Sequence, residues 1–302
     1  MDSYTTDTQH WLDKRFKMVD KEGIYHAHQP IYGFRKGHSE PGIIDRYVIT
    51  YQILERLSHL EFSSLLDVGG AEGYKAAVIR KIFNVNVRSV DLSAEACERA
   101  KAIFDIDGEA VDIHHLPYKD NEFDVVLCSE TLEHVPDLEK ATRELLRVCS
   151  KAVIITVPHD SQEIIERNIR EKIPHAHIHS LDVNSLDFLK PAGYKVISRK
   201  HHSSYLKRIL RVADAMEIQS LNSYPQFLAN IYNAFIPILR LIFNRISVNL
   251  LIKLDDYIAN SSPSYLGMSF IVLKDGNCYL HNSRKKISAR QVIDFEVPFH
   301  YL

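Results

Sequence analysis

A glycine-rich segment follows an acidic residue at the end of an apolar run. Residues 65–74 read LLDVGGAEGY, in which Asp67 precedes Gly69, Gly70 and Gly73. A glycine-rich turn between a strand and a helix lets a ligand approach the backbone without interference from Cβ atoms. A carboxylate beside that turn would repel a phosphate and would suit a cationic ligand, such as one with an α-ammonium group. The spacing also differs from the G-x-G-x-x-G of dinucleotide sites, and the usual Walker lysine is absent.

Two further acids stand at the ends of later apolar runs. Asp91 ends VNVRSVD, and an acid at this place can accept both hydroxyls of a ribose. Asp112, in EAVDIHHLPY, can accept from the exocyclic amine of a base, while Ile113 offers its backbone N–H and apolar cover. Each acid alone could be a cap or turn residue. Three acids at successive strand ends indicate one ligand-binding edge of a sheet.

The elements that would position these acids alternate between strand and helix from residue 60 onward. We expect strands over Ser64–Val68, Val85–Asp91, Gly108–Asp112, Phe123–Ser129, Ala152–Val157 and Tyr194–Arg199. Helices are expected over Gly73–Phe83, Ala94–Phe104, Leu138–Val148 and Val183–Leu189. This alternation predicts right-handed crossovers and an α/β fold with a doubly wound, mostly parallel sheet.

Two regions fall outside this alternation, which divides the chain into four segments. Residues 1–60 are expected to form a helical and aromatic cap, with GIYHAHQPIYGFRKGH followed by a helix over Ile44–Leu60. Residues 61–202 are the core, and residues 203–262 are a helical insertion that precedes the last strand. Residues 263–302 supply that strand, over Tyr265–Leu273, and a tail. Tyr25, Tyr32 and Phe34 of the cap are expected to complete the pocket, where Arg35 and Lys36 could meet an anionic group.

The core resembles the seven-stranded (class I) S-adenosylmethionine-dependent methyltransferases of the type-11 kind, with their "LPY…FDVV" block. The resemblance runs from about Leu65 to Lys200, and LLDVGGAEGY matches the family's acid-x-G-x-G-x-G loop with Ala71 in place of the middle glycine. It implies a Rossmann-like sheet of seven strands, whose reversed last strand lies near Leu266–Leu273. It also implies S-adenosylmethionine as the cofactor.

The resemblance assigns cofactor contacts to the strand ends. Asp67, Gly69 and Gly73 would hold the methionine end, Asp91 the ribose, and Asp112 with Ile113 the adenine. LPYKDNEFDVVLCSETLEHV matches the family's fourth-strand block, which lines the boundary between cofactor and acceptor. The expected cofactor-binding set is Asp67, Gly69, Gly70, Gly73, Asp91, Leu92, Asp112, Ile113, Ser129 and Glu130.

Methyl transfer from a sulfonium is a direct displacement that needs alignment of the reactants and, for some acceptors, removal of a proton. It needs no covalent nucleophile, in agreement with the absence of a G-x-S-x-G or Cys/His signature. Histidines are the candidate bases because their ordinary pKa lies near neutrality. We expect His134 in SETLEHVPD, His159 in TVPHD and His177 to serve as catalytic residues.

The run HAHIH presents three histidines at alternating positions. His175, His177 and His179 would share one face in an extended segment, and three imidazoles on a face could bind zinc. No obvious carboxylate ligand motif accompanies them, so we expect a wall of the acceptor site and no bound metal. His177 is the one expected to touch substrate.

Charge and cysteine content restrict the partners and the compartment. The 302 residues carry a formal net charge of −2, and SETL stands where nucleic-acid amino-methyltransferases usually show N/D-P-P-Y/F, so no nucleic-acid partner is expected. The four cysteines form no CxxC, which favours free thiols in a reducing compartment. The N-terminal residues lack an apolar signal-like run, and a cytoplasmic protein is expected.

The helical insertion contains the apolar run FLANIYNAFIPILRLIFNRISVNLLIKL, residues 227–254. Asparagines, Pro237 and Arg240 interrupt it too often for a comfortable transmembrane span. It could pack on its own domain, cover a lipophilic acceptor, form a homodimer interface, or lie on a membrane surface beside Lys207, Arg208 and Arg211. A peripheral membrane location is therefore an open alternative.

The expected function is S-adenosylmethionine-dependent methylation of a small-molecule or lipid-linked metabolite. Oxygen is favoured over nitrogen or carbon as the acceptor atom only because histidine bases are abundant. One alternative is a non-catalytic cofactor-binding protein that regulates a partner. Another is an NAD(P)-dependent oxidoreductase, against which Asp67 and the D-x-G-G-x-x-G spacing count.

Overall fold

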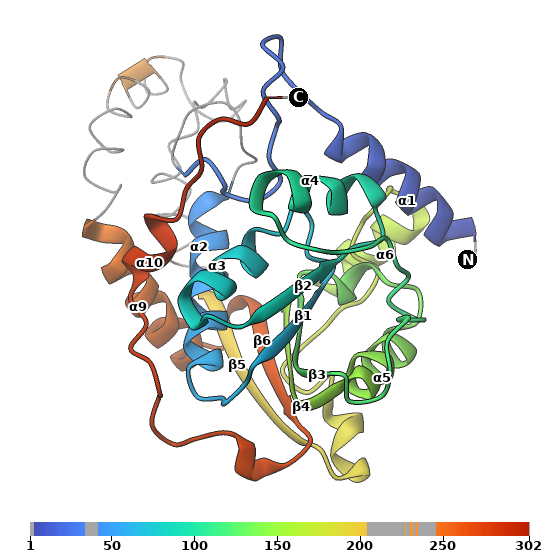
Figure 1. Ribbon diagram of the computed structural model, residues 1–302, viewed down its shortest axis with the longest axis vertical. Helices are drawn as coiled ribbons and strands as arrows, with labels where there is room; N and C mark the ends of the chain where they lie inside the picture. Colours follow the sequence, from blue (N-terminus) through green and yellow to red (C-terminus); the bar gives the residue numbers. More distant parts are fainter. Residues whose placement is uncertain are drawn as a thin grey trace.

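The structure is a computed structural model that describes residues 3–33, 42–203 and 246–301, with residues 227, 230, 231 and 234 between them. Its centre is a six-stranded sheet in the order β2-β1-β3-β4-β6-β5 (Figure 1). The strands are β1 (Ser64–Val68), β2 (Asn86–Val90), β3 (Phe123–Ser129), β4 (Cys149–Pro158), β5 (Lys195–Ser203) and β6 (Tyr265–Leu273). β2, β1, β3 and β4 pair in parallel, and β6 runs antiparallel to both β4 and β5. The doubly wound, mostly parallel α/β sheet with a reversed last strand is confirmed.

The expected strand over Gly108–Asp112 is wrong, so the described residues form six strands and not seven. The chain still runs along β2, since the N–H of Ser89 donates to the carbonyl of Asp107 (3.1 Å) and that of Val111 to the carbonyl of Asp91 (2.8 Å). Pairing is limited to one parallel bridge between Asp91 and Ala110. The polar sequence DIDGEAVD offers few apolar side chains to bury on either face of a sheet.

Helices cover both faces of the sheet. The α-helices of the described residues are α1 (Ser3–Phe16), α2 (Ile43–Leu57), α3 (Tyr74–Phe83), α4 (Ala94–Phe104), α5 (Leu138–Val148), α6 (Gln162–Arg170), α9 (Ile246–Ser261) and α10 (Ala289–Ile293). Short 3-10 helices are η1 (Leu132–His134), η2 (Asp187–Ala192) and η3 (Gly276–Cys278). The helix expected over 183–189 is therefore wrong in type and place, and α6 was not expected.

Successive side chains of a strand point to opposite faces of the sheet, so they join two separate hydrophobic cores. Leu65 and Val125 join the core with α2, α3 and α4, whereas Leu66 and Val126 join the core with α5. The four cysteines are free.

The aromatic stretch of the N-terminal cap packs against the C-terminal tail. The N–H of Val297 donates to the carbonyl of Ile31 (2.8 Å), and the rings of Tyr32 and Phe299 lie 5.1 Å apart. Tyr25 and Tyr32 are fully buried there and do not line the cavity described below, so their expected place in the pocket wall is wrong. Phe34, Arg35 and Lys36 lie outside the described residues.

Of the expected insertion, the structure describes residues 203, 227, 230, 231, 234 and 246–262. α9 packs on β5, where Arg199 pairs with Asp256 and the N–H of His202 donates to Asp255 (2.9 Å). Lys207, Arg208, Arg211, Pro225, Pro237 and Arg240 lie outside the described residues, so the lid, interface and membrane alternatives stay predictions. Within the described ranges, no helix has the length and apolar character needed to cross a membrane.

Candidate active site

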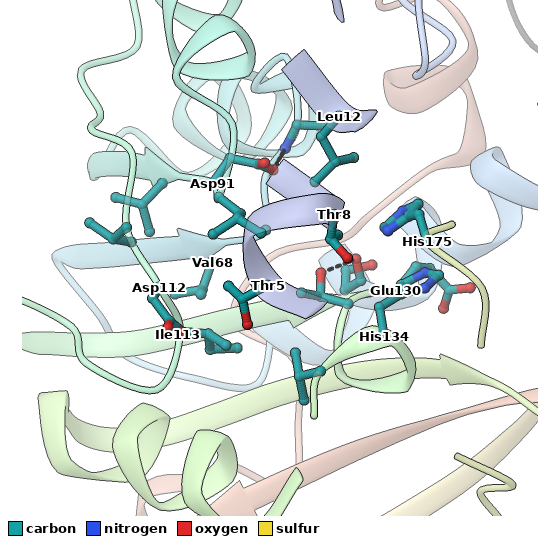
Figure 2. A pocket seen from close by; sticks show the side chains of 18 of the residues that line it. Thr5, Thr8, Leu12, Val68, Asp91, Asp112, Ile113, Glu130, His134 and His175 are labelled. Atoms are coloured by element: carbon teal, nitrogen blue, oxygen red, sulfur yellow. Dashed lines mark hydrogen bonds between the residues drawn. The ribbon is translucent and has the colours of Figure 1, made fainter. Parts of the chain in front are cut away.

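One cavity opens at the carboxyl ends of β1, β2 and β3, beneath α1 (Figure 2). The strand ends and the loops after them contribute Val68, Gly69, Ala71, Asp91, Leu92, Asp112, Ile113, Ser129, Glu130, Thr131 and His134. α1 contributes Tyr4, Thr5, Thr8, Leu12 and Phe16, and other segments add His28, Gln29 and His175. Figure 2 shows Asp112 and Ile113 at one end of the cavity and Glu130, His134 and His175 at the other, with α1 between them.

The glycine loop is folded tightly onto the neighbouring strands. The N–H groups of Gly69 and Gly70 both donate to the carbonyl of Val90 (2.8 and 3.1 Å). Gly69 has φ +74°, and a Cβ at this position would overlap the side chain of Thr131. Glycine is therefore required here both by the left-handed backbone and by the lack of space.

Asp91 is held at the cavity wall by two backbone groups. Its Oδ2 accepts from the N–H of Ala71 (2.9 Å) and its Oδ1 from the N–H of Ser93 (3.0 Å). Burial raises the pKa of Asp91, and these two N–H groups partly offset that shift. A carboxylate has about four acceptor positions. Asp91 therefore keeps acceptor capacity for the hydroxyls of a ribose.

Asp112 lies at the end of the cavity with Ile113. Its Oδ1 accepts from the backbone N–H of His114 (2.9 Å) and from that residue's ring Nδ1 (2.6 Å). Burial opposes ionisation, but the bonds from His114 outweigh it and hold the pKa of Asp112 below its ordinary value. A charged carboxylate beside an apolar wall suits the amine edge of an adenine.

Asp67 lies beneath the loop and not in the cavity wall. Its side chain is 1% exposed, and Oδ2 lies 3.0 Å from where a Cβ on Gly70 would stand. Burial raises the pKa of Asp67 to about 6, and the buried Lys75 ammonium partly offsets that shift. Gly70 and Gly73 also lie outside the cavity lining, so these three expected contacts support the loop from behind.

Ser129, the last residue of β3, and Glu130, which follows it, are polar and line the cavity. The hydroxyl of Ser129 shares a hydrogen bond with that of Thr156 (2.7 Å). Glu130 follows with a left-handed φ of +56°. Burial raises the pKa of Glu130, and Lys75 partly offsets the shift. Its Oε1 is buried and makes no hydrogen bond to any described residue.

Of the three expected catalytic histidines, only His134 lines the cavity. Its Nδ1 donates to the carbonyl of Ala176 (3.1 Å), its ring stacks on His175 at 3.8 Å, and burial lowers its pKa well below the ordinary value. His159 instead bonds through Nδ1 to the carbonyl of Leu181 (2.6 Å) and stacks on Tyr265.

Residues 66–157 match a family described as a methyltransferase domain. This part of the chain is a methyltransferase domain, as the resemblance to the class I S-adenosylmethionine-dependent methyltransferases implies. Norajmaline N-methyltransferase from Rauvolfia serpentina is 33% identical over 101 residues, which cover 31% of this chain and 35% of that protein. Sarcosine/dimethylglycine N-methyltransferase from Halorhodospira halochloris is 26% identical over 171 residues, which cover 51% and 61%. The chain thus spans about a third of the length of the first of these relatives.

A solved structure agrees in fold with this chain. Geranyl diphosphate C-methyltransferase from Streptomyces coelicolor A3(2), in complex with Mg²⁺, geranyl diphosphate and S-adenosyl-L-homocysteine, aligns with a TM-score of 0.54 and 12% identity. The alignment covers 91% of this chain and 98% of that protein. The cofactor of the family is S-adenosylmethionine, and the strand-end acids Asp91 and Asp112 fit its ribose and its adenine amine.

The histidines of HAHIH do not form the single face expected for them. His175 turns into the cavity with a left-handed φ of +51°, whereas His179 bonds through Nε2 to the carbonyl of Val135 (2.6 Å). His177 bonds through Nδ1 to Asp160 and lies 4.8 Å from the ring of His134, just outside the cavity lining. The segment is irregular, so alternation in sequence does not become alternation in space.

Sequence reasoning missed the contribution of α1 to this cavity. α1 is tied to α4, where the hydroxyl of Ser93 bonds to Asp13 and Nε of Arg99 donates to the carbonyl of Phe16 (3.3 Å). These bonds join residues about 80 positions apart, and no local sequence pattern predicts them.

His28, Gln29 and Glu72 were missed as well. His28 and Gln29 line the cavity, and the fully buried carboxylate of Glu72 accepts from the N–H of Gln29. In the sequence, the acid within GGAEG was the only feature that pointed to the contact between Glu72 and Gln29.

Proposed function

We propose that the chain transfers the methyl group of S-adenosylmethionine to a small-molecule acceptor bound beside Glu130 and His134. The observation that carries this proposal is one cavity that joins the strand-end acids to a polar far end beneath α1. Concave sites of this kind, lined by apolar groups and a few polar ones, suit small molecules better than polymers.

The order of the lining residues supports one orientation of the cofactor. Adenine beside Asp112 and Ile113, and ribose beside Asp91, would bring the sulfonium past Gly69 toward Glu130. The methyl group would then point into the end of the cavity that contains His134 and His175. Transfer would be a direct displacement, for which the chain supplies alignment and exclusion of water.

Oxygen is the proposed acceptor atom, with His134 as the proton acceptor. Because Nδ1 of His134 donates to the carbonyl of Ala176, its Nε2 has a free lone pair. The Glu130 carboxylate lines the same end. Both groups favour a hydroxyl, since a hydroxyl must lose its proton during transfer whereas an amine can react in its neutral form. The curated relatives above are named as N-methyltransferases, so this choice rests on the side chains of this chain alone.

A lipid-linked acceptor and a membrane or dimer contact through residues 203–262 belong to the same proposal. They depend on the apolar run of that segment, most of which lies outside the described residues. A requirement for vesicles or for a long acyl chain on the acceptor would support them, and equal turnover of short acceptors would count against them.

The first test is calorimetric titration with S-adenosylmethionine and S-adenosylhomocysteine. Asp91→Asn should weaken both at least tenfold, about 1.4 kcal/mol, because it removes the charge that accepts the ribose hydroxyls. Asp107→Asn is the matched control, since Asp107 is an exposed acid paired with Lys101 and should bind as wild type does. A folded wild-type protein that binds neither ligand would overturn the proposal.

The second test measures S-adenosylhomocysteine release with matched hydroxyl and amine acceptors. Turnover of hydroxyl acceptors alone supports oxygen, and turnover of amines alone overturns that part of the proposal. Cofactor binding without turnover, together with full biological activity in the Asp91→Asn variant, would favour a regulatory protein over an enzyme.

A further inference from the structure

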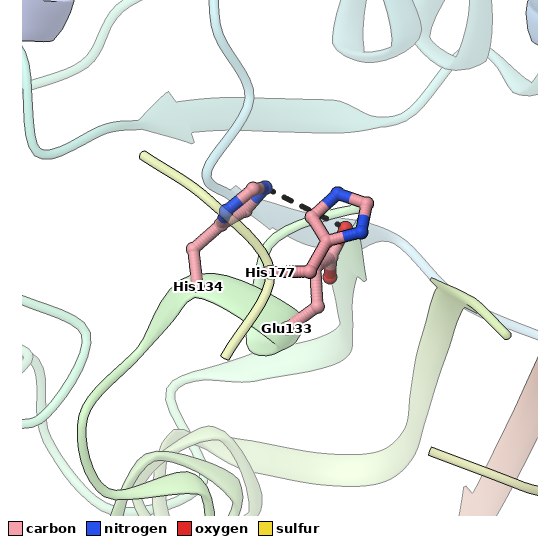
Figure 3. A group of neighbouring side chains, drawn as sticks. All are labelled: Glu133, His134 and His177. Atoms are coloured by element: carbon pink, nitrogen blue, oxygen red, sulfur yellow. Dashed lines mark ion pairs between the residues drawn. The ribbon is translucent and has the colours of Figure 1, made fainter. Parts of the chain in front are cut away.

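Three potential metal ligands meet beside the end of the cavity that contains His134, which is the one of the three that lines it. Glu133 and His134 lie in η1, directly after β3, and His177 comes from the separate segment before η2 (Figure 3). One ligand atom from each residue lies within 4.8 Å of the other two. Figure 3 shows the side chains of His134 and His177 gathered around the carboxylate of Glu133.

The tautomers of both histidines are suited to metal binding. Nδ1 of His134 donates to the carbonyl of Ala176, and Nδ1 of His177 bonds to the carboxylate of Asp160. Each ring therefore keeps Nε2 as its lone-pair nitrogen. Histidine ligands commonly have this arrangement, in which a carbonyl or carboxylate fixes the ring and raises its basicity.

Glu133 supplies the strongest indication that this cluster binds a cation. Its side chain is 1% exposed, and its Oε2 is buried and makes no hydrogen bond to any described residue. Oε1 is 3.7 Å from Nε2 of His134. Glu130 and Asp160 also act on Glu133 electrostatically, and Lys75 is the cation acting on it from the described residues. A buried carboxylate near other carboxylates is costly unless cations compensate it fully.

We propose that Glu133, His134 and His177 bind a divalent first-row transition ion, such as Zn²⁺ or Fe²⁺. Two imidazoles and one carboxylate match the preferences of these ions, whereas Mg²⁺ and Ca²⁺ prefer oxygen ligands. Ligand atoms around a tetrahedral zinc lie about 3.4 Å apart, so the site closes by rotation of side chains. With three protein ligands, a tetrahedral ion keeps its fourth coordination position for another group.

The proposed ion deepens the proposed function and, for its catalytic role, rests on it. Because His134 lines the cavity, the open position would be available to an acceptor oxygen. The ion would lower the pKa of that hydroxyl, whose proton passes to solvent. The oxygen then forms its bond to the methyl carbon, and the electron pair of the broken S–C bond stays on sulfur. In this form of the reaction the ion replaces His134 as the group that activates the hydroxyl.

The test titrates chelator-treated protein with Co²⁺ and follows its visible d–d absorption, with Zn²⁺ as competitor. Wild type should bind one equivalent, and His177→Ala should bind at least tenfold more weakly. His179→Ala is the matched control, because it removes a histidine of the same segment whose Nε2 bonds to the carbonyl of Val135 and which is not part of the cluster. Glu133→Gln, which preserves the shape of the side chain, should also weaken binding at least tenfold.

Titration with S-adenosylhomocysteine in parallel separates the two proposals and reports whether each variant is folded. No Co²⁺ binding by a wild-type protein that binds S-adenosylhomocysteine overturns the metal site alone. Equal Co²⁺ affinity of the His177 and His179 variants also overturns it. Failure of the folded protein to bind S-adenosylhomocysteine overturns the proposed function, whatever the Co²⁺ result.

Discussion

The two ends of the cavity are built in different ways. At the cofactor end, Asp91 and Asp112 stand at or after strand ends and are fixed by nearby backbone groups, such as the N–H of Ser93 and of His114, each two residues away. At the acceptor end, His134 is fixed by the carbonyl of Ala176, 42 residues away. The cofactor end is thus part of the sheet, whereas the acceptor end is assembled from segments that meet only in the folded chain.

This difference has a consequence for mutations. Changes behind the cofactor end should reduce stability, because the loop and the sheet share one core. Changes at the acceptor end should reduce turnover and leave the fold intact. Five substitutions test this contrast.

The largest effect is expected from Lys75→Met, behind the cofactor end. The Lys75 side chain is buried and acts electrostatically on Asp67 and Glu130, which would be left as buried carboxylates without compensation. The free energy of unfolding should fall by about 3 kcal/mol in urea titration. Lys101→Met, at an exposed lysine with two surface ion pairs, should change it far less, because solvent screens such pairs. Equal effects would show that the buried charges do not stabilise the loop.

A pH effect follows from Asp67. Its pKa of about 6 in the fold exceeds the ordinary value, so the folded state keeps a proton that the unfolded chain has already lost. The contribution of Asp67 to the free energy of unfolding should therefore be greatest at low pH and fall as pH rises to about 6, by up to about 3 kcal/mol at 1.36 kcal/mol per pKa unit.

Asp67→Asn isolates this effect from the other carboxylates. The variant has no proton to lose at this position, so its free energy of unfolding should decline less between pH 4 and pH 6 than that of wild type. Parallel curves for the two proteins over this range would contradict the raised pKa of Asp67. Cofactor-free protein must be used for both, because ligand binding is itself linked to stability.

A smaller effect, on binding, is expected from Gly69→Ala. A Cβ at this position would overlap Thr131, so the loop must shift and S-adenosylhomocysteine affinity should fall at least tenfold, about 1.4 kcal/mol. Gly193→Ala is a close control: φ is +91° there, but a Cβ would meet nothing within 4 Å. It carries the same kind of backbone strain and should leave affinity unchanged. Unchanged affinity in the Gly69 variant would mean that the loop adapts.

The same contrast explains what the sequence could and could not predict. The strands β1, β3 and β6 and the helix α4 have the predicted bounds, because apolar runs and helical spacing are local signals. Asp91, Leu92, Asp112, Ile113, Ser129 and Glu130 line the cavity as their strand-end positions suggested. The resemblance to methyltransferases supplied the roles that spacing alone left open.

Most of the acceptor end of the cavity could not be predicted from local sequence patterns. The cover provided by α1 depends on bonds from Ser93 and Arg99 of distant chain segments, and the place of His177 depends on Asp160. His159 failed as a cavity residue because its ring is used to bond Leu181. A histidine after a strand can serve the site or the fold, and only the tertiary partner of its nitrogens distinguishes the two.

At the acceptor end, His175→Ala tests the other half of the contrast. His175 stacks on both His134 and Trp11 at the cavity wall, so its loss should loosen the acceptor site. We expect kcat/KM to fall about fivefold, roughly 1 kcal/mol, with the affinity for S-adenosylhomocysteine unchanged. The free energy of unfolding should change by no more than about 1 kcal/mol. A larger loss of stability would mean that this end also belongs to the folding core.

The smallest effect is expected from Ala71→Gly, where the chain departs from the glycine of the family loop. Ala71 has φ +49°, a conformation that costs a residue with a Cβ about 1–2 kcal/mol. Glycine removes that cost but adds about 0.4–1 kcal/mol of unfolded-chain entropy, and the bond from the N–H of residue 71 to Asp91 is retained. The free energy of unfolding should therefore rise by about 0.5 kcal/mol. Ala77→Gly, inside α3, should lower it by about 1 kcal/mol. Equal losses in both variants would mean that the Ala71 methyl contributes packing at the cavity wall that outweighs its backbone strain.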